Sequence, residues 1–425
     1  MSTSTEKKKS KGLCTIPLPQ PIDWDTRETA ALKHIDQLPF ILQQGNNEVN
    51  YIGALTELFM EQSNPLRKKT AKYWEPYFLK EKTLIDFFTD WLTFIPVPSN
   101  PGKYIVFWDY LVNTNPGVHL ANDEAFKPWF RAFLNFHGDF INSTASANKK
   151  KLNKWKEDKG TTAHPFKMTD FLLPDEKSET CGFESFNQFF LRNVKEKLRP
   201  MCKDADKPKT VVAPCDGGIF FLNRGDSQGN HSENQDHDLP GKSDSFNLQE
   251  ALPGYGRYFE NGPLLDILLW FTDYHHFHAP VSGKVIHQGM YHGSYNYDFG
   301  DYDPSDFYAP NRTSDSDRVG WYEKLGKHQR YVWIIKTEDL GLVAMVAIGF
   351  WGVGSIVNGL GDGTPEVKKG DYMGHFGYGG SSIVLAFSPD VDLDFQVNGT
   401  EVSGPDNPTL MKVRECLAKP PKKNK

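Results

Sequence analysis

The first third of the chain has apolar residues at helical spacing. They form three series, which are Ile52, Leu55 and Phe59; Leu84, Phe88, Trp91 and Ile95; and Trp129, Phe133 and Phe136. The second series stops at Pro96, and Pro128 precedes the third, where it suits a first helical position. The spacing predicts helices between residues 45 and 140 that pack on one another. Aromatic amphipathic helices lying on a membrane surface are the alternative.

Beyond about residue 173 the pattern changes to short β-like runs separated by polar loops. The runs cover residues 217–222, 283–291, 330–336, 342–351, 382–387 and 394–398. The fold class predicted from both halves is α+β. We expect a flexible N-terminal arm (1–40), a helical N-terminal domain and linker (41–172), and a β-rich domain (173–425). The linker itself is the Ser-, Lys- and Asn-rich segment 143–165.

Residues 340–361 carry no charged side chain, and the stretch is long enough for a membrane-spanning helix. It is rich in Val and Ile and is interrupted repeatedly by glycine. β-Branched residues with glycine between them favour strands over a helix. The segment therefore predicts two buried strands joined by a Gly turn.

Composition narrows the class of protein. The chain has 425 residues, enough for two or three domains, and a formal net charge of −6, which argues against a nucleic-acid partner. Residues 1–11 lack the apolar core of a signal peptide. The five cysteines are odd in number and show no C-x-x-C spacing, which argues against a disulfide framework and a Cys-based zinc site. We expect a soluble, cytoplasmic protein.

Three segments in the second half carry candidate chemistry: Ala213–Gly218, Asp273–Pro280 and Gly379–Ser382. Taken singly, each has an ordinary explanation. Asp-Gly is a common turn and Gly-Gly-Ser-Ser a common loop. The histidine cluster could bind zinc, since His276 and His278 would share one face of a strand. A metal hydrolase built on these histidines is therefore one hypothesis.

Taken together, the segments resemble the phosphatidylserine decarboxylases, a family of pyruvoyl-dependent enzymes. The resemblance covers about residues 183–405, over half of the chain. Its motifs are Phe186-Asn187-Gln188-Phe189-Phe190-Leu191-Arg192, Arg199-Pro200, Ala213-Pro214-Cys215-Asp216-Gly217, the run Asp273–Gly283, Val353-Gly354-Ser355-Ile356, the run Lys369–Phe376 and Gly379-Gly380-Ser381-Ser382. The order of these motifs along the chain makes the resemblance specific. It implies that residues 173–425 form a pyruvoyl-dependent decarboxylase domain.

The chain departs from the family pattern in three ways. The usual signature is Leu-Gly-Ser-Thr, whereas this chain has Gly-Gly-Ser-Ser, and the spacing from Phe376 to the serine is one residue longer. The N-terminal half also lacks the membrane-anchoring segment typical of the lipid enzymes. These features resemble a soluble branch that includes fungal tryptophan decarboxylases. We therefore expect a free aromatic amino acid such as L-tryptophan as substrate, with phosphatidylserine, converted to phosphatidylethanolamine, as the alternative.

The resemblance also implies roles for individual residues. Ser381 Oγ would attack the Gly380 carbonyl, and the chain would cleave itself into 1–380 and 381–425. Ser381 would thereby become a pyruvoyl group that decarboxylates the substrate through a Schiff base. Gly380, lacking a Cβ, could adopt the strained backbone that this step needs. Ser382 is the fallback nucleophile.

A serine needs a neighbouring base before it can act as a nucleophile. We assign that role to His278, with Asp216 orienting its imidazole, as in a Ser-His-Asp triad. By resemblance, His275 belongs to the substrate site. No metal is expected, and the aromatic-rich loop 292–327 is a candidate lid. A catalytically inactive binding protein is a further alternative, but Gly380, Ser381, His278 and Asp216 together argue against it.

Overall fold

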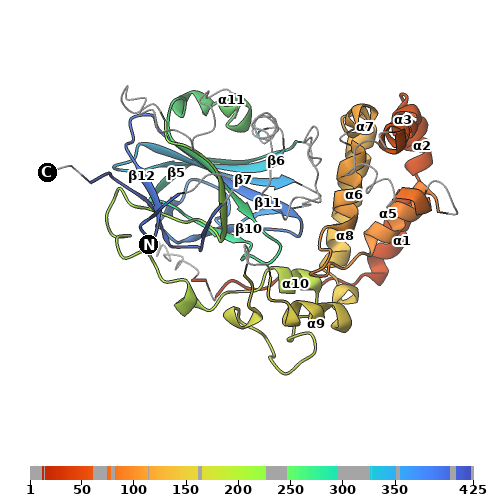
Figure 1. The fold of residues 1–425 in the computed structure, drawn as a ribbon, viewed down its shortest axis with the longest axis horizontal. Coiled ribbons are helices and arrows are strands. Elements are labelled where there is room, and N and C mark those ends of the chain that lie inside the picture. The colour runs from red at the N-terminus through yellow and green to blue at the C-terminus, as the bar shows by residue number, and fades with distance from the viewer. Residues whose placement is uncertain are drawn as a thin grey trace, which may run out of the picture.

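In the computed structural model, helices dominate the first half of the chain and strands the second half (Figure 1). The structure describes residues 12–13, 15–60, 74–77, 82–112, 114–160, 165–225, 247–293, 326, 328–350, 355–402 and 408–422. Helices and strands are thus segregated along the chain, which is the α+β class predicted from the sequence. The division into folding domains stays a prediction.

The helical part is held together by aromatic side chains. Its helices and the two short ones that follow are α1 Asp25–Ile35, α2 Leu38–Gln43, α3 Asn47–Met60, α5 Leu84–Leu92, α6 Lys103–Val112, α7 Asn115–Ala121, α8 Phe126–Ile141, α9 Lys149–Glu157, α10 Phe186–Phe190 and α11 Leu248–Ala251. Thr83 and Asp86 cap α5 reciprocally, each side chain accepting the backbone N–H of the other. The apolar faces of α5 and α8 meet, and the rings of Phe88 and Phe133 lie 4.9 Å apart, edge to face. The predicted packing of these two helices on each other is confirmed.

Two segments expected to be irregular are helical. Residues 25–43, placed in the flexible arm, form α1 and α2, and α1 packs on α8. Ala31 and Ile35 lie one helical turn apart and are buried, which fixes α1 to the core. The expected linker contains α9, whose Leu152 and Trp155 are buried. In both segments a few apolar residues at helical spacing outweigh a polar composition.

Two details of the predicted helices are corrected. Ile52 of α3 is 52% exposed, whereas Leu55 is buried, so the first apolar series is only partly core. Pro128 is the third residue of α8 rather than the first. It still lies in the first turn, where a missing N–H costs no helical hydrogen bond.

The described residues of the β-rich part form three antiparallel sheets. Its strands are β1 Val211–Val212, β2 Gly217–Asn223, β3 Leu264–Leu269, β4 His276–His278, β5 Gly283–Tyr291, β6 Gln329–Lys336, β7 Leu342–Phe350, β8 Ile356–Asn358, β9 Glu366–Val367, β10 Tyr372–Phe376, β11 Gly380–Phe387, β12 Asp394–Val397, β13 Thr400–Glu401, β14 Thr409–Met411 and β15 Cys416–Lys419. The strand orders are β14-β2-β3-β11-β7-β6-β5-β9, β4-β10-β8 and β1-β15-β12-β13. All six predicted runs form strands, and the uncharged stretch 340–361 contains β7 and β8.

Strand β11 lies inside the eight-stranded sheet, between β3 and β7, and all of its residues are buried. Ile383 and Leu385 belong to one apolar core, and Val384 and Ala386 belong to the other. A strand that is covered on both faces has a continuous apolar sequence, which explains why the sequence pattern predicted β11. The start of β11 is therefore held firmly in the molecule.

One expectation about the cysteines is wrong. Cys202 and Cys416 are joined by a disulfide, with their Cα atoms 5.0 Å apart. They are 214 residues apart in the sequence, so no spacing pattern could reveal the pair. Cys181 and Cys215 are free and buried, and Cys14 lies outside the described residues.

None of the helices in the described ranges is both long enough and apolar enough to cross a membrane.

Candidate active site

Ser381 is the second residue of β11, and it pairs with Leu269 of β3 and Gly349 of β7. Its side chain is fully buried, and its hydroxyl has no hydrogen-bond partner in the described part of the structure. The residue with a positive φ in this segment is Gly379, at 142°, rather than Gly380, where strain was expected. A buried hydroxyl without a partner is costly, and such groups often have a chemical role.

Ser382 is held differently. Its hydroxyl donates a hydrogen bond to the buried carboxylate of Asp266 in the neighbouring strand β3. Side chains alternate along a strand, so Ser381 and Ser382 face opposite sides of the sheet. The two adjacent serines are thus distinguished by their partners, and the unengaged hydroxyl belongs to Ser381.

His278 lies in β4 and is fully buried. Its Nδ1 is 3.0 Å from the carbonyl oxygen of Gly370, so Nδ1 carries the proton that is donated. Its Nε2 then accepts a hydrogen bond from the Tyr274 hydroxyl at 3.2 Å. Burial lowers the pKa of His278 to about 3, against the opposing effects of the Gly370 hydrogen bond and the Asp216 charge. The neutral ring therefore has its proton-accepting lone pair on Nε2.

Asp216 belongs to a buried charge network. Arg199 donates two hydrogen bonds to its carboxylate, at 3.0 and 2.6 Å, and the Val413 N–H donates a third at 2.9 Å. Lys412 Nζ lies 3.5 Å from both the Asp216 and the Asp273 carboxylates. Burial alone would raise the pKa of Asp216, but the charges of Lys412 and Arg199 and these hydrogen bonds lower it to about 2. Asp216 is therefore ionised over a wide pH range.

His275 precedes β4 and stacks on Phe190 of α10, with ring centroids 3.8 Å apart. Its Nδ1 lies 3.1 Å from the Asp273 carbonyl oxygen, and its buried Nε2 has no partner among the described residues. Burial, assisted by the charge of Arg192, lowers the pKa of His275 to about 3. The ring is neutral at pH 7 and leaves one acceptor unused.

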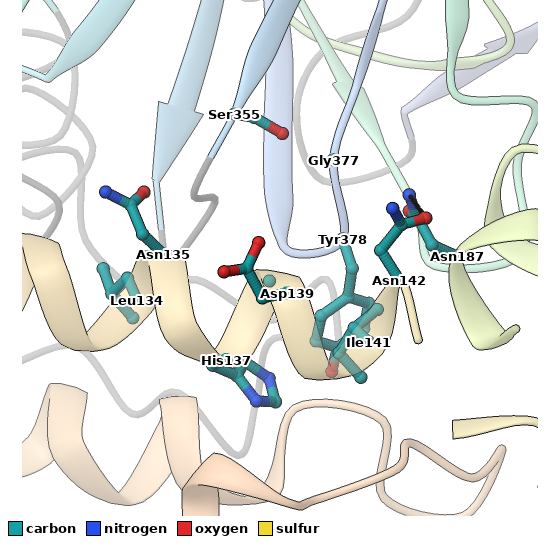
Figure 2. A pocket seen from close by; sticks show the side chains of 11 residues that line it. Leu134, Asn135, His137, Asp139, Ile141, Asn142, Asn187, Ser355, Gly377 and Tyr378 are labelled. Atoms are coloured by element: carbon teal, nitrogen blue, oxygen red, sulfur yellow. Dashed lines mark hydrogen bonds between the residues drawn. The ribbon is translucent and has the colours of Figure 1, made fainter. Parts of the chain in front are cut away.

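A cavity of about 300 Å³ lies between α8 and the segment that leads into β11 (Figure 2). Its lining residues are Leu134, Asn135, His137, Gly138, Asp139, Ile141, Asn142, Asn187, Ser355, Gly377 and Tyr378. Figure 2 shows Asn135, Asp139 and Asn142 on the side of α8 that faces Ser355. The Tyr378 ring lies 5.5 Å from Phe190, the residue that stacks on His275. The cavity wall and His275 are thus connected through the rings of Tyr378 and Phe190.

The structure brings some of the predicted site residues together. The His278 N–H donates to the Pro214 carbonyl oxygen at 2.7 Å, so the Asp216 and His278 segments are neighbours. Within the described ranges, however, no hydrogen bond joins the His278 ring to Asp216 or to Ser381. Asp216 instead accepts hydrogen bonds from the Arg199 side chain and the Val413 backbone N–H. The triad roles of these residues stay predictions.

Several residues of the site were not assigned by the sequence analysis. Arg199 and Tyr274 both belong to motifs of the resemblance, but neither was given a role. The sequence did not indicate a role for Lys412, because a lysine near the end of a chain is usually solvated. Asp139 likewise resembled the polar face of an amphipathic helix.

Two further expectations concern metals and the loop. Among the residues that the structure describes, no three His, Cys, Asp or Glu side chains gather in a way that could hold a metal ion. Nε2 of His276, one of the histidines considered for zinc, lies 2.8 Å from the Leu191 carbonyl oxygen. The aromatic residues of the candidate lid 292–327 lie almost entirely outside the described residues.

Comparison with known proteins identifies the family. The sequence model of phosphatidylserine decarboxylase matches residues 186–405, just over half of the chain. The chain belongs to the phosphatidylserine decarboxylase family. The match begins at α10 and includes Asp216, His275, His278, Gly380 and Ser381. Helices α1 to α9 lie outside it.

Relatives of the phosphatidylserine decarboxylase family carry two kinds of name. Phosphatidylserine decarboxylase proenzyme 3 of Schizosaccharomyces pombe is 28% identical over 213 residues, which are 49% of this chain but only 19% of that protein. A phosphatidylserine decarboxylase proenzyme of Clostridium botulinum is 28% identical over 255 residues, covering 60% of this chain and 74% of the relative. An L-tryptophan decarboxylase of Psilocybe cubensis is 22% identical over 356 residues, covering 79% of this chain and 78% of that relative. The chain is thus a member of a family of decarboxylases, or carboxy-lyases, several of which are named as proenzymes.

Proposed function

We propose that the chain is a self-processing, pyruvoyl-dependent decarboxylase that removes the α-carboxylate of a free amino acid as CO2. The observation that carries the proposal is the buried, unpartnered hydroxyl of Ser381 at the start of β11. Nothing in the described surroundings holds this hydroxyl, whereas the adjacent Ser382 is bound to Asp266. Family membership supports the same residue, because the matched region extends through it.

Self-processing is a rearrangement of the bond between Gly380 and Ser381. Ser381 Oγ attacks the Gly380 carbonyl carbon, the peptide C–N bond breaks, and an ester forms. A base then takes the Cα proton of residue 381, and β-elimination breaks the Cβ–Oγ bond. Gly380 leaves as a carboxylate, and water hydrolyses the new N-terminus to a pyruvoyl group with release of ammonia. In this scheme His278 Nε2 accepts the hydroxyl proton.

The surroundings of residue 381 suit such a group. Ser381 Oγ and His275 Nε2 are both buried without a partner in the described part of the molecule, so the site leaves polar atoms for a reacting molecule. When present, the pyruvoyl group supplies the electron sink that stabilises the carbanion left by CO2. We assign His275 to proton delivery at the substrate Cα. Asp216 maintains the charge network behind the His278 segment.

Cleavage would leave the two products assembled. Residues 381–425 contribute β11 to the eight-stranded sheet and β15 to the four-stranded sheet. Both strands pair with neighbours from residues 1–380, for example Ser381 with Leu269. The Cys202–Cys416 disulfide also joins one product to the other. The processed protein is therefore expected to remain one folded unit.

Phosphatidylserine is the second candidate substrate. Its support is that the matching family model and two of the relatives described above carry that name. The free amino acid is supported by the tryptophan decarboxylase, whose match extends over 79% of this chain and so includes much of the helical part. The departures of the Gly-Gly-Ser-Ser segment from the usual signature favour the same choice.

The test is the mass of the denatured protein together with CO2 release. With reductant, we expect chains 1–380 and 381–425, the smaller one blocked to Edman sequencing. Without reductant, the disulfide should keep the two as one covalent species. CO2 release from tryptophan should exceed release from dispersed phosphatidylserine, and hydroxylamine should inhibit both.

Two matched variants assign the nucleophile. Ser381→Ala should remain one uncleaved chain and release no CO2, because no Oγ is left to attack. Ser382→Ala should still cleave, because its hydroxyl is bound to Asp266. Cleavage in Ser381→Ala but not in Ser382→Ala would move the nucleophile to Ser382. A fully active, uncleaved wild-type chain would contradict the pyruvoyl mechanism.

A further inference from the structure

The cavity beside α8 has two walls of different origin. Asn187, Ser355, Gly377 and Tyr378 lie in the region matched by the family, whereas the α8 residues lie outside it. A Cβ added to Gly377 would come within 2.4 Å of Ser355 Oγ, so this wall is closely packed. The wall formed by α8 is therefore the one in which this chain can differ from other family members.

The charged group in the described lining of the cavity is a hydrogen-bond acceptor, the Asp139 carboxylate. Asp139 contributes a carboxylate, and the buried Oδ1 of Asn187 has no partner among the described residues, because its Nδ2 donates to Asn142 at 3.2 Å. None of the described residues that line the cavity is a lysine or an arginine. Arg27 approaches Asp139 from outside the lining, at 3.8 Å, with a side chain that is 56% exposed. Such a lining favours a ligand that donates hydrogen bonds and disfavours a phosphate.

The cavity is within reach of the reacting residue. Tyr378, in its wall, is three residues before Ser381, and three residues span at most about 11 Å. The Tyr378 hydroxyl donates to the Pro101 carbonyl oxygen, which fixes this wall to the helical part. A volume of about 300 Å³ is at the lower end of the range for small-molecule pockets. One amino acid could therefore have its reacting end at residue 381 and its side chain in the cavity.

We propose that this cavity binds the substrate side chain and that Asp139 selects side chains ending in an N–H or O–H donor. The inference rests on the proposed decarboxylase function and adds the chemical class of its substrate. In phosphatidylserine the group attached to the serine side chain is a phosphate diester. That group would meet the Asp139 carboxylate in a wall without cations, so the same residue that accepts a donor repels the lipid.

Tryptophan and phenylalanine are the matched probes, because only tryptophan carries a side-chain donor. In Asp139→Leu, kcat/KM for tryptophan should fall roughly 10- to 100-fold, mainly through KM, while the value for phenylalanine stays near wild type. Asp139→Asn is isosteric and keeps an acceptor, so its loss should be about 3- to 10-fold. Glu124→Gln is the control, since it removes a carboxylate that pairs with Lys127 outside the cavity. It should behave as wild type.

The outcomes separate this inference from the function on which it rests. Uncleaved wild-type protein or no CO2 release would contradict the proposed function, and the inference would fall with it. Complete cleavage with an unchanged ratio of tryptophan to phenylalanine in both Asp139 variants would overturn the inference alone. Wild-type preference for dispersed phosphatidylserine would overturn it as well. If Asp139→Leu fails to fold, the ratio in Asp139→Asn decides.

Discussion

The two halves of the molecule contribute different kinds of residue to the same site. In the β-rich half, Ser381, His275, His278 and Asp216 are at most 1% exposed and are held by strands or by charge pairs. In the helical half, the Asp139 side chain is 37% exposed where it lines the cavity, and it pairs with the largely exposed Arg27 at 3.8 Å. The groups proposed to react are thus in the interior, and the residue proposed to choose the substrate is near the surface.

The difference suggests how one family can act on different substrates. A change among the buried residues disturbs packing, charge pairing and chemistry at once. A change on α8 alters the cavity while the aromatic core behind it, such as Phe88 against Phe133, stays the same. Substrate choice can therefore vary in the helical half without loss of the chemistry in the β-rich half.

The largest effect expected in the β-rich half is the loss of self-processing in His278→Ala. Without the Nε2 lone pair, no base takes the Ser381 proton, and a general base typically contributes 10²- to 10⁴-fold. We expect a mostly uncleaved chain when intact mass is followed over time after synthesis. Cleavage at the wild-type rate would remove His278 from the mechanism.

Tyr274→Phe is the matched control for His278. It removes the hydroxyl that donates to Nε2 but leaves the Nδ1 hydrogen bond to Gly370 in place. Cleavage should continue, because the lone pair on Nε2 becomes more accessible. A block equal to that of His278→Ala would show that the Tyr274 hydroxyl takes part in proton transfer.

The second prediction concerns Asp216, whose role as an orienting residue is less direct than the sequence suggests. Asp216→Asn leaves Arg199 without its anionic partner and removes one of the two carboxylates beside Lys412, which keeps Asp273. Breaking a buried charge pair costs about 3–5 kcal/mol. We expect a matching decrease in the free energy of unfolding, measured by urea denaturation. Self-processing should slow because the segment around His278 is less well held.

Asp204→Asn provides the comparison for Asp216. Asp204 also pairs with cations, Lys207 and Lys419, but it does so near the surface. Its removal should change stability little, since exposed ion pairs contribute little. A large loss of stability in Asp204→Asn with none in Asp216→Asn would contradict the importance given to burial.

The sequence predicted the β-rich half well, for physical reasons. The run 342–350, for example, is continuously apolar, so β7 could be assigned from local pattern alone. Ser381, His278 and Asp216 lay in motifs and could be named. Their partners could not, because Lys412 and the Cys202–Cys416 pair depend on contacts between distant parts of the chain.

The helical half was predicted less completely. The helix α1 has only two buried residues among charged ones, so its pattern resembled a polar arm. The cavity wall on α8 was missed because Asn135 and Asp139 lie on the polar side of the helix. A polar face next to a cavity and a polar face in water have the same sequence pattern. Only the neighbouring Gly377–Tyr378 segment distinguishes them.

The most gradual effect expected is a loss of stability in mild acid. Burial lowers the pKa of His137 in the helical half to about 4, and of His275 and His278 in the β-rich half to about 3, from an ordinary value of 6.5. Below pH 6.5 the unfolded chain therefore binds more protons than the folded one, so stability should fall as pH decreases from 6.5 towards 4. The ion pairs of Asp216, with a pKa of about 2, are lost only at lower pH.

This acid effect can be divided between the two halves. Urea unfolding midpoints, measured at intervals from pH 7.5 to pH 4.5, should decrease below about pH 6.5 in the wild-type protein. His137→Gln removes the titrating ring from the helical half only, so its midpoint should depend less steeply on pH while the β-rich half keeps its own dependence. Asp273 and Asp139, whose pKa values are raised by burial, act in the opposite sense, but they are two groups against several histidines. A midpoint that stays constant down to pH 4.5 would mean that the buried histidines acquire protons in the folded state, and that water reaches the interior of both halves.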